Sequence, residues 1–167
     1  MAENDIIIDG FGRLGGVVHM VLKNLDADEL AYRPYDKGNS IAWLVWHLSR
    51  VQDDHVAELA DTEQVWISGG WHDKFGLPFE KQATGYGHDT DQVSEVEVEA
   101  DLLRGYFDDV HRATVEFIDS LKPQDYERIV DENWNPPVTL AQRLVSVLSD
   151  DLQHAGQAAY VRGILGT

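Results

Sequence analysis

The sequence predicts an all-α fold, a four-helix bundle with a long loop rich in glycine and aromatic residues between its second and third helices. Four segments carry apolar residues at alternating steps of three and four, the spacing that lines one face of a helix. No segment has a convincing sheet pattern. With 167 residues, of which 43% are hydrophobic, the chain is long enough to bury one core. We therefore expect a single domain over residues 1–167.

The first two helices are expected over about residues 4–25 and 41–60. Glycines inside the first lower its helix propensity, so this helix either packs tightly against a neighbour or is locally irregular. Ser40 is a suitable N-cap for the second. The shared apolar face of the first helix comprises Ile7, Phe11, Leu14, Val18, Val21 and Leu25. On the second helix, one face holds Leu44, His47, Leu48, Val51 and His55.

The segment 61–98 differs from the rest, because it combines several glycines with many aromatic residues. Loops of this length inside a domain are usually functional or disordered, and the aromatic residues favour an ordered lid or a cover over the end of the bundle. In its last part, VSEVEVEA, the valines alternate with acidic or small residues. This alternation allows a short edge strand as an alternative.

The third and fourth helices are expected over about residues 99–121 and 139–163. Pro123 ends the third helix, and Thr139 can cap the fourth after two prolines. Long connections leave the order and handedness of the four helices open. The stripe of the third helix comprises Leu103, Phe107, Val110, Thr114, Phe117 and Leu121, and that of the fourth begins with Leu140, Leu144, Val147 and Leu148.

Composition excludes several classes of function. Thirteen basic and thirty acidic residues give a formal net charge of −17, which repels nucleic acid. The chain has no cysteine, so any thiol chemistry must use a small-molecule thiol. The N-terminus is acidic where a secretory signal would be basic, and no apolar run is long enough to cross a membrane. We expect a cytoplasmic protein that associates with neither nucleic acid nor membrane.

The strongest local signal for chemistry is DDLQHAGQ, residues 150–157. Side chains four apart on a helix lie on one face, so Asp150 and His154 can hold one metal ion. A third ligand must come from another helix, and His47, which lies among apolar neighbours, is the best candidate. The residue pattern alone leaves alternatives open: His47 as a hydrogen-bonded core histidine, and Asp150 with His154 as a solvent-facing ion pair.

Two stretches of the chain resemble the signature regions of the DinB superfamily of metal-binding four-helix bundles. They are NSIAWLVWHLSRVQDDHV, preceded by ELAYRP, and DDLQHAGQAAYVRGIL. The resemblance covers nearly the whole chain and is nearest to the mycothiol S-transferases and mycothiol-dependent maleylpyruvate isomerase. It implies that His47, Asp150 and His154 are the metal ligands. Asp150 stands where glutamate or histidine is commoner, and Gln157 where some relatives have another histidine, which leaves metal affinity and identity open.

The resemblance implies a metal-dependent transferase that conjugates a low-molecular-weight thiol, mycothiol, to small electrophiles in detoxification. Zinc is the expected metal, with nickel, manganese or iron as alternatives. A homodimer is also expected from the family. Other open readings are a non-enzymatic metal- or ligand-binding stress protein and a metal-assisted hydrolase. Candidate residues for anchoring the thiol are Arg33, Tyr35, Trp71, Gln157 and Arg162.

Three further residues are weaker candidates for the site. His55 lies two helical turns beyond His47, too far to bind the same ion, and is expected to support the site or to lie on the surface. His72 and Tyr86, in the long loop, can face a substrate, although solvated loop residues are commoner.

Overall fold

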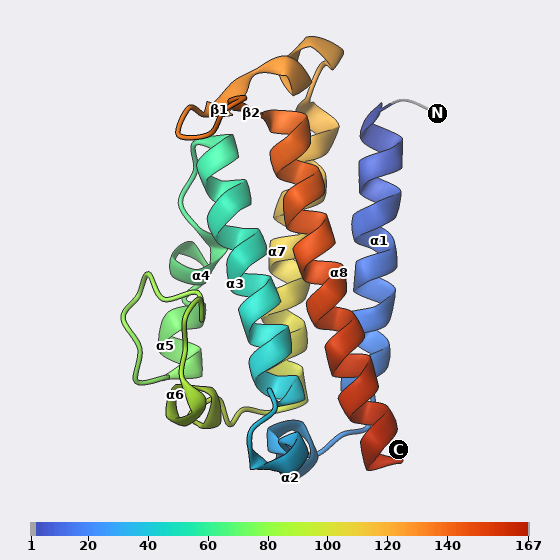
Figure 1. Ribbon diagram of the computed structural model, residues 1–167, viewed down its shortest axis with the longest axis vertical. Coiled ribbons are helices and arrows are strands. Elements are labelled where there is room, and N and C mark those ends of the chain that lie inside the picture. Colours follow the sequence, from blue (N-terminus) through green and yellow to red (C-terminus); the bar gives the residue numbers. More distant parts are fainter. Residues whose placement is uncertain (1–2, 167) are drawn as a thin grey trace.

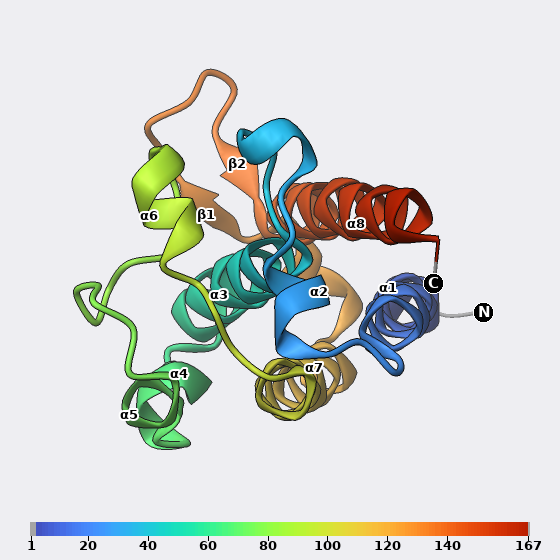
Figure 2. The ribbon, with the colours of Figure 1, turned by 90° about the horizontal axis from the view of Figure 1, so that it is seen from below.

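The computed structural model describes residues 3–166, and four long helices dominate it (Figure 1). They are α1 (Glu3–Leu22), α3 (Ile41–Ala60), α7 (Ala100–Ser120) and α8 (Leu140–Leu165). Each packs against two neighbours, so that the order around the bundle is α1, α8, α3, α7 (Figure 2). α3 and α7 run in the same direction, while α1 and α8 run in the other (Figure 1). The predicted all-α bundle is confirmed, and the structure supplies the helix order that the sequence left open.

Local chemistry explains where the helices begin and end. The Ser40 hydroxyl accepts a hydrogen bond from the Trp43 amide at 3.1 Å, and Thr139 caps α8 through the Gln142 amide, as predicted. α1 ends three residues before the expected boundary, and Asn24 just beyond it has a φ of 59°. α8 continues past Gly163 to Leu165, and the left-handed Gly166 then ends it.

The glycines of α1 do not interrupt the helix. A Cβ on Gly10 would lie 2.6 Å from Cδ2 of Leu148 on α8, so α1 approaches α8 closely at this point. Gly12 and Gly16 would meet nothing within 4 Å and are not required by packing. Of the two alternatives for this helix, tight packing and local irregularity, the structure therefore shows tight packing, at Gly10.

Short elements fill the connections. The first contains α2 (Ala27–Ala31) and a 3₁₀ turn (Pro34–Asp36). The long connection between α3 and α7 contains α4 (Val65–Ser68), α5 (Trp71–Phe75) and α6 (Thr90–Ser94), and it lies along one side of the bundle against α3 and α7 (Figures 1 and 2). No described helix is long and apolar enough to cross a membrane.

The alternative of an edge strand near residues 93–98 is wrong. Asp89 caps the amides of Asp91 and Gln92 and so starts α6, which includes Val93. Val96 and Val98 are buried in the core without a partner strand. The strands that the described residues do form are elsewhere, in a small antiparallel hairpin of β1 (Ile129–Asp131) and β2 (Val138–Thr139) before α8. This hairpin could not be predicted from the sequence, because strands of two and three residues are too short to show an alternation.

Candidate metal centre

The three predicted metal ligands converge between α3 and α8. His47 comes from α3, and Asp150 and His154 come from α8, one helical turn apart. One potential ligand atom from each residue lies within 4.8 Å of the others. The His47 and His154 rings are 4.7 Å apart between centroids, at 72° to each other. Two neighbouring helices thus bring two imidazoles and one carboxylate to a single point.

The His47 ring is held in one orientation. Its Nδ1 lies 2.5 Å from the carbonyl oxygen of Thr84, and because a carbonyl only accepts hydrogen bonds, Nδ1 must carry the proton. The Trp43 indole stacks on the ring at 4.6 Å. Nε2 is therefore the nitrogen with a free lone pair. Burial lowers the pKa of His47, whose exposed fraction is 6%, so the imidazole is neutral at pH 7 and available as a ligand.

His154 is oriented by the same logic. Its Nδ1 lies 2.9 Å from the backbone carbonyl oxygen of Asp150 and 3.5 Å from Oδ2 of that residue. The carbonyl again requires a proton on Nδ1 and leaves Nε2 free. The exposed fractions are 17% for the His154 side chain and 44% for that of Asp150. The pair therefore lies at the edge of the core, with its histidine turned inward beside His47.

A cleft of about 480 Å³ adjoins the three residues. His55 is part of its wall and so faces the cleft. The buried Nδ1 of His55 has no hydrogen-bond partner among the described residues. Burial and the nearby Arg143 lower the pKa of His55. Tyr86 also lines the cleft and is otherwise exposed, whereas His72 pairs with Asp73 elsewhere. The remaining lining comprises Val51, Asp54, Thr84, Ser146 and Val147.

Residues 83–85, in the long connection, were missed by the sequence analysis. Gly85 has a φ of 92°, and a Cβ there would lie 2.8 Å from Nδ1 of His47 and 2.9 Å from Cζ3 of Trp46. Only glycine fits this backbone conformation against the ring without strain. The signal was present in the glycines of ATGYGH, but nothing in the sequence indicated that they would lie against α3.

None of the five predicted thiol anchors lines this cleft. The Arg33 side chain donates to the Gly38 and Thr90 carbonyls and joins two connections. Trp71 donates from Nε1 to Asp109 on α7. Arg162 donates to the carbonyls at the end of α1.

The other two anchors also lie outside this cleft. Tyr35 is exposed. Gln157 lines an open, mostly apolar cleft between the first connection and α8, together with Pro34 and Tyr160. The structure therefore gathers the metal ligands but disperses the residues expected around them.

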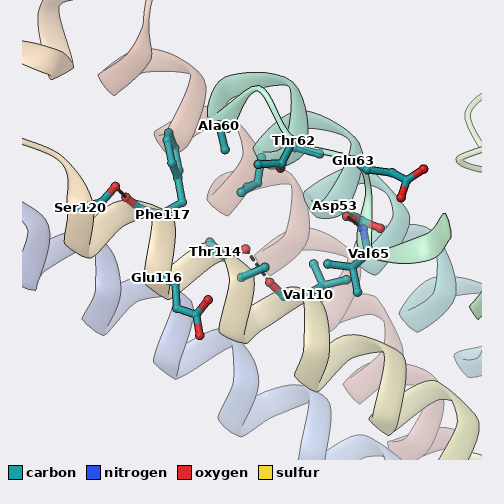
Figure 3. Close-up of a pocket in the computed structure, with 13 residues that line it drawn as sticks. Asp53, Ala60, Thr62, Glu63, Val65, Val110, Thr114, Glu116, Phe117 and Ser120 are labelled. Atoms are coloured by element: carbon teal, nitrogen blue, oxygen red, sulfur yellow. Dashed lines mark hydrogen bonds between the residues drawn. The ribbon is translucent and has the colours of Figure 1, made fainter. Parts of the chain in front are cut away.

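A second cleft, of about 340 Å³, lies on the other side of α3, between α3, α4 and α7 (Figure 3). Its wall is mainly apolar and includes Val110 and Phe117 of α7. Asp53 lies at one end, where it accepts hydrogen bonds from the amides of Val65 and Trp66 at 2.8 and 2.7 Å. No histidine lines this cleft, so the metal-ligating chemistry is confined to the α3–α8 side of the described structure.

Comparison with known proteins decides the family. The sequence model described as mycothiol S-transferase matches residues 13–166. The chain belongs to the mycothiol S-transferase family. This DinB-like membership confirms the resemblance seen in the two signature stretches.

A solved structure supports the fold of this family member. It is described as the crystal structure of the conserved protein of locus from Enterococcus faecalis, and it is similar over 100% of this chain and 99% of its own. The sequence identity is 28% and the TM-score is 0.93. A search of curated proteins gave no match.

The residues of this member of the mycothiol S-transferase family fit a divalent metal. Two imidazoles and one carboxylate are a donor set typical of catalytic zinc, which also keeps a position open for water or substrate. The adjoining cleft gives that position access from solvent. Both Nδ1 atoms bind backbone carbonyls, the arrangement that fixes metal-binding histidines in proteins.

Proposed function

We propose that this protein is a metal-dependent S-transferase that conjugates mycothiol to small electrophiles, with a divalent ion, zinc in the first place, held by His47, Asp150 and His154. The observation that carries the proposal is the convergence of one potential ligand atom from each residue within 4.8 Å, beside a cleft of about 480 Å³. Membership of the mycothiol S-transferase family supports the thiol. A bound divalent ion would lower the pKa of a coordinated thiol and so supply a thiolate at neutral pH.

The chain's own residues bind and orient. His47 and His154 each present Nε2, because a backbone carbonyl holds the proton of Nδ1 in both. Asp150 offers a carboxylate oxygen that offsets part of the ion's charge. The protein has no cysteine, so the attacking sulfur belongs to the small-molecule thiol. No side chain is required to form a covalent intermediate.

The charge of the cleft favours a thiol without carboxylates. Asp54, which is not among the proposed ligands, lines it, and the whole chain carries a formal charge of −17. A sugar-based thiol such as mycothiol enters this field without repulsion, whereas glutathione and bacillithiol bring carboxylates of their own. This supports mycothiol over anionic thiols as the cosubstrate.

The test is metal-dependent consumption of an electrophilic bimane by zinc-loaded protein. We expect turnover with mycothiol, little with glutathione, and none without metal. His154→Ala should weaken zinc binding by more than about 100-fold, because two ligands remain. His19→Ala, which changes a histidine bonded to Asp108 away from the site, should leave zinc binding unchanged.

The alternatives give different results in the same assays. Thiol-independent cleavage of an ester would indicate a metal-assisted hydrolase. Zinc binding without turnover of either kind, but with a mycothiol-dependent rise in melting temperature, would indicate a ligand-binding protein. No turnover with zinc and authentic mycothiol contradicts the transferase proposal.

The proposal includes a homodimer, which rests on the family resemblance, and a cytoplasmic location, which rests on the expectation from the sequence. Analytical ultracentrifugation of the metal-loaded protein tests the first, and fractionation of the producing cells tests the second. A monomer at micromolar concentration would remove the dimer from the proposal.

A further inference from the structure

Arg50 is fully buried in α3, three residues after His47. A guanidinium cannot lose its charge in a protein, so its burial is costly unless partners replace the lost water. A buried ion pair also adds little net stability compared with apolar side chains of the same volume. The contacts that Arg50 makes therefore indicate what its presence achieves.

The guanidinium reaches three elements. Its Nε–H donates to the carbonyl oxygen of Ala83 at 3.0 Å, and Nη1 donates to the Tyr106 hydroxyl at 3.2 Å. Nη1 also lies 3.5 Å from Oδ2 of Asp53, and the Trp66 ring is 4.9 Å from the guanidinium carbon. Arg50 thus joins α3 to α7, to α4 and to the segment that contains Ala83.

Asp53 completes the network. Its carboxylate accepts the amides of Val65 and Trp66 and the hydroxyl of Tyr106, at 2.7 to 2.8 Å. These donors belong to α4 and α7, which pack against α3, whereas Asp150 and His154 belong to α8. Arg50 is consequently anchored from behind by fixed groups, while its Nε–H points to the segment 83–85.

That segment is the one that holds His47. Thr84 follows Ala83 directly and accepts the Nδ1–H of His47, and Gly85 lies against the same ring. Two side chains of α3, less than one turn apart, therefore bind two successive carbonyls of one short segment. If the Ala83 contact is lost, the Thr84 carbonyl has less to keep it at the ring.

We infer that Arg50 is a positioning residue for the metal centre: by fixing Ala83 it holds the Thr84 carbonyl against His47, so that the ring keeps its proton on Nδ1 and presents Nε2 toward Asp150 and His154. The inference rests on the proposed function in treating His47 as a ligand. Arginine suits this role better than lysine, because its planar fork donates in several fixed directions at once.

The first test measures the protonation pattern of His47 in metal-free protein by nitrogen-15 NMR, with His47→Gln to assign the signals. Wild type should show the proton on Nδ1. In Arg50→Lys, whose single ammonium cannot reproduce the fork, the form with the proton on Nε2 should appear. Gln52→Met is the matched control, because Gln52 is fully buried on the same helix and bonds Thr114 on α7.

The second test measures zinc affinity by competition with a chelator. Arg50→Lys should weaken zinc binding by about 10- to 100-fold, the range found when a group that orients a ligand is lost. Gln52→Met should leave it unchanged. In a double-mutant cycle, Arg50→Lys combined with Gly85→Ala should weaken binding by less than the product of the single effects, because both act through residues 83–85.

Tyr106→Phe provides a milder variant if Arg50→Lys fails to fold. It removes one anchor of the guanidinium and should give a smaller change of the same kind in the His47 signals. Folded Arg50→Lys or Tyr106→Phe protein with the wild-type Nδ1 proton and wild-type zinc affinity would overturn the inference. The NMR readout needs no metal, so it still tests Arg50 if the wild-type protein binds no zinc and the proposed function fails.

Discussion

Replacing Gly85 with alanine perturbs the candidate metal centre with a single methyl group. Gly85 has a φ of 92°, and its Cβ would lie 2.8 Å from Nδ1 of His47, 2.9 Å from Cζ3 of Trp46 and 3.2 Å from Cζ2 of Trp43. These are ring atoms of buried side chains, which cannot rotate away as the end of a flexible chain would. Gly87→Ala is a matched control, since Gly87 has a φ of 76° with nothing within 4 Å of its Cβ.

The two variants share the cost of backbone strain and differ in the cost of the contacts that the new methyl group makes. An alanine in the left-handed region costs about 1–2 kcal/mol at either position. At Gly85 the overpacked methyl adds about 1–3 kcal/mol, and loss of the His47–Thr84 hydrogen bond adds about 1 kcal/mol. We therefore expect Gly85→Ala to be less stable than Gly87→Ala by about 2–4 kcal/mol, and to be the variant that weakens zinc binding.

Urea denaturation of the metal-free proteins measures the first difference, and competition with a chelator measures the second. Since the backbone strain cancels between the variants, the remainder reports contact with His47 and its neighbours. Equal unfolding free energies for the two variants, or zinc affinities that both match wild type, would refute the view that Gly85 shapes the His47 environment.

Three further predictions concern other parts of the bundle. Burial lowers the pKa of His111, so as pH falls below about 6.5 the unfolded chain takes up a proton that the folded chain does not, and stability falls; urea denaturation at pH 7 and pH 5 should show a smaller loss in His111→Gln. Gly105→Ala should cost about 1–3 kcal/mol of unfolding free energy, because its Cβ would lie 2.7 Å from Cη2 of the Trp71 ring. Gly12→Ala, with nothing within 4 Å, should instead raise the unfolding free energy by about 0.5–1 kcal/mol.

Periodicity was sufficient to predict the four long helices, because each has an apolar stripe that must face the others. The Asp150–His154 pair followed from the same geometry, since residues four apart share a face on any helix. Its relation to His47 did not follow from spacing, because only the order of helices around the bundle decides whether α3 lies beside α8. The family resemblance supplied that link.

The contacts made by the connections between the long helices could not be predicted from the sequence. The segment 83–85 has no regular secondary structure, so no periodic pattern connects it with His47. Arg33 and Arg162 have long polar side chains and were predicted to anchor the thiol. Both instead donate hydrogen bonds to backbone carbonyls at the ends of other elements. Such pairings depend on where chain ends meet in three dimensions, which local sequence does not specify.

Around α3, different parts of the chain carry the proposed ligands and orient them. The side chains proposed as ligands stand on long helices whose positions the core fixes, whereas the carbonyl that orients His47 belongs to a connection without such support. Precise sites need rigid supporting groups around the ligands as well as the ligands themselves. On α3 the support comes from the next turn, where Arg50 binds the connection and Asp53 binds Arg50. Asp53 lies at the second cleft (Figure 3). A change that loosens the wall of that cleft near Asp53 should therefore reach His47 through Arg50 and Ala83.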